Sequence, residues 1–187
     1  TGFDFHFGKG REGGPAFLMA AGQDNGFGVT LVDAFRDENA SVISSSFIRS
    51  LLGEGAVVEA AGQLGYRYTV EAEVIGGKQL GRTLGYPTAN MQLPPEVELR
   101  NGIYAVKFHR PDGSVHDGVA SFGRRPTVDE DGHALLETFL FDFSGSLYGE
   151  TCSVSFFGHL RDELKFDGLD PLVEQIKKDE AEARALL

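Results

Sequence analysis

The chain has 187 residues, of which 41% are hydrophobic, so it is long enough for one domain, or for a domain and a fragment, and can build a core. Its net charge of -11 arises from 28 acidic and 17 basic residues, and it would repel the phosphates of nucleic acid and the anionic face of a membrane. We therefore expect small-molecule partners, no nucleic acid and no membrane. A small phosphate ligand is still compatible with this charge, because it needs only local positive potential.

The cysteine content and the first residues bear on the compartment. The single cysteine, Cys152, excludes an internal disulfide and suits a reducing, cytoplasmic environment. The opening TGFDFHFGKG lacks the apolar segment of a signal peptide and an initiator Met, so we expect a fragment or a processed chain. The five histidines have no ligand spacing, so we expect no metal site built from them.

Residues 1–65 have the pattern of helices that are ended by glycines. A serine before such a helix favours its N-terminus, because the hydroxyl caps free backbone N–H groups. The segment is too small for a complete α/β domain, which needs several strands. The expected elements are helices that end at Gly22, Gly53 and Gly65, a cap at Ser44 or Ser45 for the second, and a buried strand from Phe27.

Residues 66–187 alternate apolar and polar side chains, as half-buried strands do. The strand segments are separated by turn clusters such as RPDGS and SGS, and five or six such strands predict a closed or nearly closed antiparallel barrel. The tail predicts a helix with Asp170 as its cap and Pro171 in its first turn. The expected strands are YTVEAEVI, IYAVKF, VHDGVASF, LLETFLFDF and CSVSFF.

The stretch GRTLGYPTAN is the first candidate site. In the preceding glycine-rich loop, Gly76–Gly85, backbone N–H groups can approach phosphate oxygens, and Arg82 adds a fixed positive charge. Residues two apart in an extended segment point to the same side, so Thr88 and Asn90 would present a hydroxyl and a carbonyl oxygen together. Both are suitable Mg²⁺ ligands. The alternative is a surface turn in which the asparagine caps local backbone.

Glu137 is the second candidate, because it lies among apolar neighbours in LLETFLFDF. A buried carboxylate is costly unless it has a partner or a function. By alternation Glu137 shares a face with Leu135 and Phe139, which predicts that it points toward the interior and could act as a general base. The alternative is a charged residue on the solvated side of the strand.

The third candidate is HLRDELKFDGLD, residues 159–170, where charged and apolar side chains are mixed. Arg161 could bind a phosphate, and Phe166 could form an aromatic wall for a planar ligand. The alternative is a polar loop that leads into the last helix.

Several segments occur in the order and spacing of a known family: LGRTLGYPTANM, NGIYAV, GVASFGRRPTV, LLETFLFDFSGSLYG and LRDELKFDGLDPLVEQIKKD. Over residues 66–187 the chain resembles the riboflavin kinase module of bacterial bifunctional FAD synthetases. Upstream, GFDFHFGKGREG and ISSSFIR resemble the second half of the FMN adenylyltransferase domain of the same enzymes. The family has an arginine at His6 and a threonine at Ser46, and its HxGH-type motif would precede Thr1.

The resemblance implies a mainly β fold: a six-stranded antiparallel Greek-key barrel with a C-terminal helix, preceded by a partial α/β nucleotidyltransferase remnant. It implies Mg²⁺-dependent transfer of the γ-phosphoryl group of ATP to the 5′-hydroxyl of riboflavin, which gives FMN and ADP. Glu137 matches the catalytic base, and Thr88 and Asn90 match the Mg²⁺–ATP ligands. The other matching positions are Gly76, Arg82, Gly85 and Tyr148 near ATP, and Arg161, Glu163 and Phe166 in the loop that closes on the flavin.

Two other functions remain as alternatives. FMN adenylylation would use Ser44, Ser45, Ser46 and Arg49 to contact a triphosphate at a helix N-terminus, but half of that nucleotide site is missing. A flavin or nucleotide binding module without catalysis would not need the intact Thr88, Asn90 and Glu137. An orphaned half-domain in residues 1–65 would expose apolar surface from Val29–Val32 and Ile43–Leu52, which favours disorder or a homo-oligomer.

Overall fold

The computed structural model describes residues 1–37, 42–77, 85–124 and 134–187, whose packing forms two compact units, Thr1–Ser44 and Ser45–Leu187. Every buried hydrophobic side chain of the described residues belongs to the second unit. The elements of that unit are α2 (Ser45–Glu54), α3 (Val57–Leu64), β1 (Thr69–Ile75), β2 (Thr88–Leu93), β3 (Gly102–His109), β4 (Val115–Arg124), β5 (Ala134–Leu140), β6 (Thr151–Arg161) and α5 (Leu169–Leu186).

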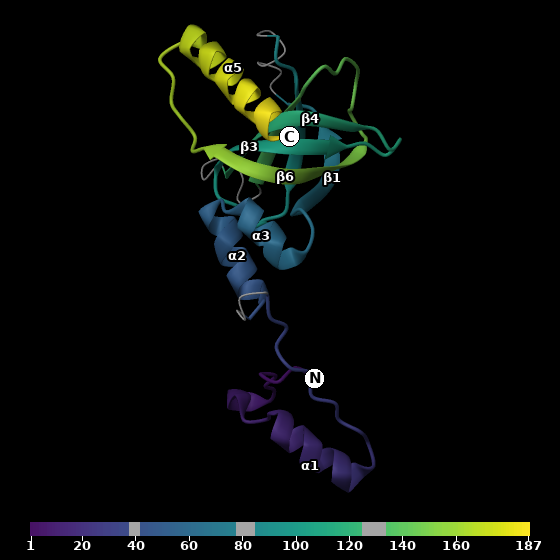
Figure 1. Ribbon diagram of the computed structural model, residues 1–187. Coiled ribbons are helices and arrows are strands. Elements are labelled where there is room, and N and C mark those ends of the chain that lie inside the picture. Colours follow the sequence, from purple (N-terminus) through teal and green to yellow (C-terminus); the bar gives the residue numbers. More distant parts are fainter. Residues whose placement is uncertain (38–41, 78–84, 125–133) are drawn as a thin grey trace. The chain divides into compact units, whose positions relative to one another are not determined.

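The six strands close into an antiparallel barrel, part of which is labelled in Figure 1. Their order is β1-β2-β5-β4-β3-β6, with β6 paired back to β1. Within it, β6 lies beside β3 of the β3-β4-β5 meander, which is the Greek-key arrangement. Closure leaves no strand edge unpaired, which removes a route to aggregation. The predicted six-stranded barrel with a C-terminal helix is confirmed. Five strands were expected from their sequence pattern, and the additional one is β2, which carries Thr88 and Asn90.

The barrel interior is filled by alternate side chains of the strands. On β5 these are Ala134, Leu136, Thr138 and Leu140, all buried. Interiors of six-stranded barrels are packed cores rather than channels, because their width suits side chains alone. The largest fully buried side chains include Tyr104, Phe108, Phe122, Phe156, Met91 and Leu93.

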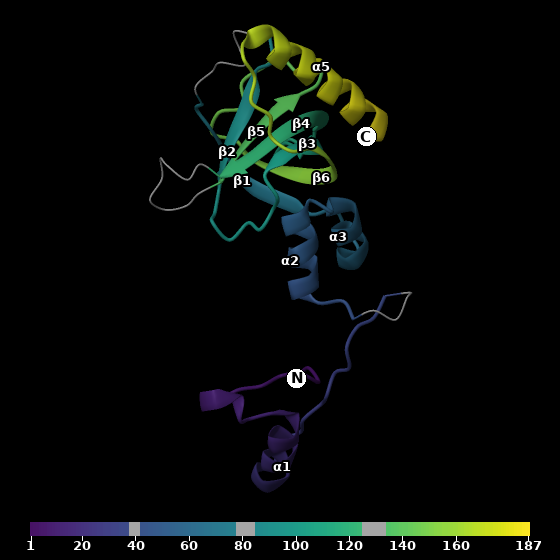
Figure 2. The ribbon, with the colours of Figure 1, turned by 90° about the vertical axis from the view of Figure 1, so that its left-hand side faces the viewer.

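Helix α5 lies across the outer surface of the barrel and packs on β3, β4 and β6 (Figure 2). The contact with β6 depends on Gly158, since a Cβ there would lie 2.8 Å from Cδ1 of Leu186. The helix begins at Leu169 with Gly168 as its N-cap, so the predicted cap at Asp170 was wrong by two residues. Asp170 instead lies in the first turn, where its charge suits the helix dipole.

Helices α2 and α3 pack with the barrel. Leu52, Val57 and Ala60 belong to the same buried cluster as the barrel core, and α3 contacts β6. Helix α2 runs past Gly53 to Glu54, so the predicted stop was wrong, whereas α3 ends at Leu64 with Gly65 as its cap, as predicted. The division by packing therefore falls at Ser45, and the domain boundary near residue 65 stays a prediction.

His159 of β6 connects the α2–α3 turn to the barrel. Its ring lies edge-on to Tyr104 at 5.0 Å, and a Cβ on Gly55 would lie 3.2 Å from its Cγ. Burial lowers the pKa of His159, a neighbouring Asp162 raises it and Arg100 lowers it further. Protonation therefore places a charge in a packed contact.

We expect His159 to make the protein less stable in mild acid. Because its folded pKa is below the ordinary value of 6.5, the unfolded chain binds the proton more tightly, and stability falls as the pH drops through and below about 6.5. The carboxylates with lowered pKa values, among them Asp142 and Glu150, lose their contribution at lower pH. Urea unfolding at about pH 7.5 and pH 5.5 should show a smaller loss for His159→Gln than for the parent. An equal loss in both proteins would contradict this assignment.

The first unit contains helix α1 (Pro15–Asn25), a short 3₁₀ turn (Lys9–Arg11) and isolated β-bridges. Gly22 does not end α1, because the helix runs to Asn25 and is capped by Gly26 in the left-handed conformation. Nor does a strand begin at Phe27, because only single bridges form among the described residues of this unit. The α/β nucleotidyltransferase remnant therefore stays a prediction.

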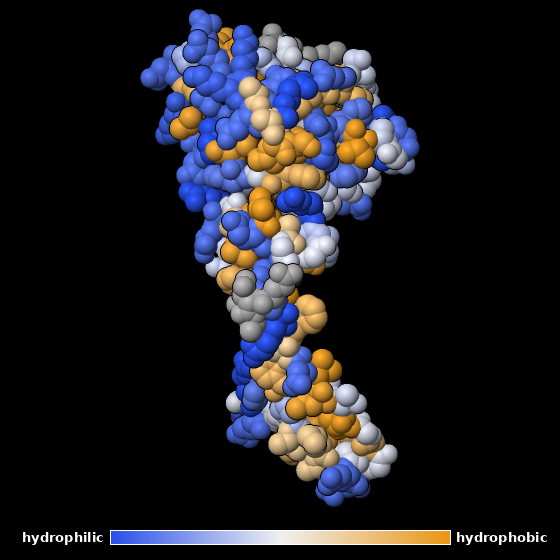
Figure 3. All heavy atoms as spheres, viewed as in Figure 1, coloured by the Kyte–Doolittle hydropathy of each residue, from blue (hydrophilic) through white to orange (hydrophobic). Residues whose placement is uncertain are grey.

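Apolar side chains gather on the surface of this first unit, as Figure 3 shows. Gly22 is the one buried residue among those described there, whereas Phe17 is 61% and Phe35 is 76% exposed. The unit therefore has no core of its own among its described residues. The expectation of exposed apolar surface is confirmed for Val32, which is 58% exposed, but was wrong for Leu52, which is 4% exposed and packs in the barrel core.

Candidate functional site

Glu137 projects from the outer face of the barrel. Its strand neighbours Leu136 and Thr138 are fully buried inside, whereas Glu137 is half-buried together with Leu135 and Phe139. The predicted shared face is therefore correct, but the prediction that this face points to the interior was wrong. On this outer face Phe139 packs in a second cluster that includes Ala183 of α5, which explains why the pattern resembled a core-facing one.

The strand register places three candidate side chains on one outer surface. Asn90 on β2 lies directly opposite Glu137 on β5, and Thr88 lies opposite Phe139. On the other side of β5, Ser121 of β4 is the partner of Glu137. Directly opposite residues project from the same face of a sheet, so a hydroxyl, an amide and a carboxylate share this surface.

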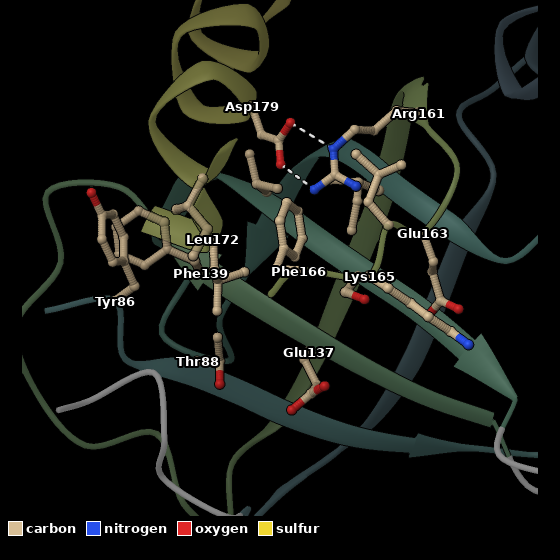
Figure 4. A pocket seen from close by; sticks show the side chains of 15 residues that line it. Tyr86, Thr88, Glu137, Phe139, Arg161, Glu163, Lys165, Phe166, Leu172 and Asp179 are labelled. Atoms are coloured by element: carbon tan, nitrogen blue, oxygen red, sulfur yellow. Dashed lines mark hydrogen bonds and ion pairs between the residues drawn. The ribbon is translucent and has the colours of Figure 1, made fainter. Parts of the chain in front are cut away.

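A pocket of about 590 Å³ opens over this surface. In Figure 4, Thr88 and Glu137 enter it from neighbouring strands, and Phe166 lies between them and the Arg161–Asp179 pair. Much of the remaining wall is apolar or aromatic, which suits a planar organic ligand with a polar end. The other lining residues are Tyr86, Ile103, Val119, Ser121, Phe139, Glu163, Leu164, Lys165, Leu172 and Ile176.

Arg161 is held by the protein itself. Its Nε and Nη2 donate to the two carboxylate oxygens of Asp179 on α5, at 2.9 and 2.7 Å, and its Nη1 donates to the Asp162 carbonyl oxygen at 2.9 Å. Gln175 also donates to Asp179, which is 3% exposed. The pair fixes the start of the segment 162–168 to α5. Arg161 lines the pocket, and its contact with a ligand stays a prediction.

Glu163 and Phe166 come from the segment after β6, which has no regular secondary structure and is the loop expected before the last helix. Both line the pocket, in agreement with their placement beside a ligand. Gly123 of β4 admits the Glu163 carboxylate, because a Cβ at that position would lie 2.7 Å from its Oε1. The roles of Glu163 and Phe166 toward a flavin stay predictions.

A second pocket of about 550 Å³ adjoins the first and shares Thr88 with it. Asn90 and Tyr148 line it, together with the segment Phe143–Leu147 that follows β5. Glu150 lies just beyond that segment and its N–H donates to the Leu147 carbonyl at 3.0 Å, while Arg110 forms a bidentate ion pair with its carboxylate at 3.0 and 2.8 Å. Hydrogen bonding from Arg110 lowers the pKa of Glu150, so this link persists through the neutral range.

The remaining predicted nucleotide contacts are less well defined. Gly76 and Gly85 flank the loop without lining either pocket, and Arg82 lies outside the described residues. No group of three or more His, Cys, Asp or Glu side chains in the described ranges could hold a metal ion. A cation would therefore need other oxygen donors, such as a hydroxyl or an amide.

The residues predicted for adenylyl transfer lie apart from both pockets. Ser45 and Ser46 begin α2, Ser44 precedes it, and Arg49 forms a long, exposed ion pair of 3.9 Å with Glu98. Their role in binding a triphosphate stays a prediction.

Sequence reasoning missed several lining residues. Tyr86 and Phe139 form an edge-to-face pair at 5.1 Å, and Ser121 and Asp179 come from elements that local patterns treat as ordinary strand and helix. The cross-strand register would have identified Ser121, but that register becomes known only when the barrel is closed.

Two family models match parts of the chain. A family model described as riboflavin kinase matches residues 64–187, and one described as FAD synthetase matches residues 1–47. The chain belongs to the riboflavin kinase family. None of the helices in the described ranges is long and apolar enough to cross a membrane.

Two relatives are named bifunctional riboflavin kinase/FMN adenylyltransferase. The protein of Listeria monocytogenes is 40% identical over 186 residues, covering 99% of this chain and 58% of its own length. That of Haemophilus influenzae is 42% identical over 184 residues, covering 98% and 59%. The chain thus spans about three-fifths of the length of these relatives, and both relatives are longer than the part that matches.

A solved structure has a similar fold throughout. A crystal structure described as a macrolide-efflux protein from Streptococcus pneumoniae matches 98% of this chain and 58% of its own, with a TM-score of 0.79 and 34% identity. The description concerns that protein, and the shared fold is what carries over to this chain.

Proposed function

We propose that the chain is a riboflavin kinase, which transfers the γ-phosphoryl group of ATP to the 5′-hydroxyl of riboflavin and yields FMN and ADP. The observation that carries the proposal is that Thr88 belongs to two adjoining pockets, with Glu137 beside it in one and Asn90 in the other. Phosphoryl transfer requires two substrates to meet end to end at one point. Thr88 marks such a point.

The first pocket suits the flavin. An isoalloxazine ring is planar and largely apolar, and Phe166, Phe139 and Leu172 offer matching walls. The ribityl chain is polar and would extend toward Glu137, which is the one carboxylate of β5 that faces this pocket. The second pocket then receives the nucleotide, with the exposed Tyr148 at its wall.

Thr88 and Asn90 fit a magnesium ion. The Asn90 amide nitrogen donates to the Thr88 carbonyl at 3.2 Å, which directs its oxygen away from that contact, and both side chains line the nucleotide pocket. A hydroxyl and an amide oxygen are ligands that Mg²⁺ accepts beside phosphate oxygens. When bound, the ion would neutralise charge on the β- and γ-phosphates.

Glu137 would act as the general base. The riboflavin 5′-oxygen attacks the γ-phosphorus, the bond from that phosphorus to the β–γ bridging oxygen breaks, and ADP leaves. The hydroxyl proton passes to the Glu137 carboxylate. The segment 162–168, held to α5 through Arg161 and Asp179, would exclude water and so limit ATP hydrolysis.

Cytoplasmic location and association into a homo-oligomer stay predictions. The names of the relatives also include FMN adenylyltransferase. We expect this second activity to be weak in this chain, because few side chains of residues 1–44 pack together.

A direct assay tests the function. Incubation of the chain with riboflavin, ATP and Mg²⁺ should give FMN and ADP in equal amounts, resolved by chromatography. Incubation with FMN and ATP should give little FAD. Riboflavin binding by calorimetry without FMN formation would support a binding module and overturn the kinase proposal.

We expect Phe166→Ala to weaken flavin binding selectively. Loss of one aromatic wall removes stacking and apolar contact worth about 1–2 kcal/mol, which raises the riboflavin KM roughly 5- to 30-fold. The KM for ATP should stay close to that of the parent, because Phe166 lines the other pocket. Steady-state kinetics with each substrate varied in turn separates the two constants. Equal changes in both would contradict the division of the pockets.

A further inference from the structure

The close approach of Gly77 to Asn90 stands out among the glycines near the site. A Cβ on Gly77 would lie 2.7 Å from Cγ and 2.9 Å from Oδ1 of Asn90, and closer still to Nδ2. Real Cβ atoms do not make contacts this short, so either the Asn90 amide or the backbone at Gly77 would have to move. The neighbouring Gly76 has no atom within 4 Å of its own Cβ position.

This approach explains why Asn90 is buried although it projects from the outer face of the barrel. The side chain is 5% exposed, and the chain leaving β1 passes over it at Gly77. Its Nδ2 donates to the Thr88 carbonyl, and none of the described residues donates a hydrogen bond to its Oδ1. The amide is therefore held on one side by backbone and on the other by a residue without a side chain.

We propose that Gly77 is a positioning residue, whose missing side chain lets the backbone after β1 hold the Asn90 amide so that its oxygen faces the nucleotide pocket. The inference rests on the proposed function and deepens it, because it names what orients one of the two oxygen donors for Mg²⁺. A positioning partner of a metal ligand commonly changes metal affinity 10- to 100-fold when altered. Gly77 itself makes no contact with the ion or the reacting atoms.

The test compares Gly77→Ala with Gly62→Ala. Both replace a glycine by alanine, but only the methyl group at position 77 reaches Asn90, and Gly62 on α3 lines neither pocket. We expect Gly77→Ala to raise the Kd for Mg²⁺–ADP roughly 10- to 100-fold, measured by calorimetry, whereas Gly62→Ala should leave it within about twofold of the parent. The riboflavin KM should change less than twofold in both variants.

A readout without ligand isolates the geometry. In ¹H–¹⁵N spectra of the free protein, the Asn90 side-chain amide signals should shift or broaden in Gly77→Ala and stay in place in Gly62→Ala. In an Asn90→Ala background, Gly77→Ala should cost less than twofold further in Mg²⁺–ADP affinity, because the overlap is gone. Equal effects of the two alanines, or full additivity with Asn90→Ala, would overturn the proposal.

The outcomes separate this inference from the proposed function. If the parent chain makes no FMN but Gly77→Ala still moves the Asn90 signals and weakens Mg²⁺–ADP, the kinase proposal fails and the positioning role stands. If the parent makes FMN while Gly77→Ala matches Gly62→Ala in every measurement, the positioning role fails alone. A parent chain that binds no Mg²⁺–ADP overturns both.

Discussion

Glu137→Gln is expected to lower kcat for riboflavin phosphorylation by roughly 10²- to 10⁴-fold, the usual contribution of a general base. Glutamine keeps the size of the side chain but cannot accept the hydroxyl proton as the oxygen attacks. Because Glu137 is half-buried at the pocket floor and its shape is preserved, affinities for riboflavin and Mg²⁺–ADP should stay within about threefold of the parent. Stopped assays for FMN give kcat, and calorimetry gives the affinities.

The matched control is Glu73→Gln. Glu73 is an exposed carboxylate on strand β1 of the same barrel and lines neither pocket, so its removal should leave kcat unchanged. Turnover of Glu137→Gln at the parent rate would show that another group takes the proton. A loss of riboflavin binding equal to the loss of rate would instead assign Glu137 to substrate binding.

Asp179→Ala is expected to destabilise the fold by about 3–5 kcal/mol, because it leaves the Arg161 guanidinium largely buried without its partner. The loss should also loosen the segment 162–168, whose first residue is tied to α5 through this pair. Urea unfolding followed by circular dichroism measures the change, and the slope of the transition shows whether the same surface is exposed.

Glu180→Ala, one residue further along α5, is the control. Its ion pair with Arg184 is a partly exposed i,i+4 contact, worth only a few tenths of a kcal/mol. Replacing the buried pair on both sides, as Arg161→Met with Asp179→Leu, should recover much of the stability, since no uncompensated charge remains. If Asp179→Ala unfolds at the same urea concentration as Glu180→Ala, the buried pair does not hold α5.

Local patterns gave most of the strands of the barrel. The alternation in YTVEAEVI and CSVSFF reflects one side chain in and the next out, so β1 and β6 form where expected. The strand from Phe27 failed because a strand needs a partner across a ladder, and the described first unit offers only single bridges. The glycine stops at Gly22 and Gly53 failed because glycine is tolerated inside a helix at modest cost.

Some features of the candidate site could be predicted from the sequence and others could not. The residue types and spacing in GRTLGYPTAN, and the shared face of Glu137 with Phe139, could be predicted from periodicity and chemistry alone. The side of the barrel that Glu137 faces could not, because apolar neighbours look alike whether they are covered by the core or by α5. The partner of Arg161 lies 18 residues further along the chain, on a helix whose placement no local pattern contains.

By itself, therefore, the sequence determined which residues could do the chemistry and which elements would carry them, because side-chain period and turn chemistry act over a few neighbouring residues. Tertiary structure decided the rest. Closure of the barrel paired Asn90 with Glu137, packing of α5 turned an apolar outer face into a pocket, and the path of the chain after β1 laid Gly77 over Asn90. These are contacts between segments far apart along the chain, and they exist only once the whole barrel has formed.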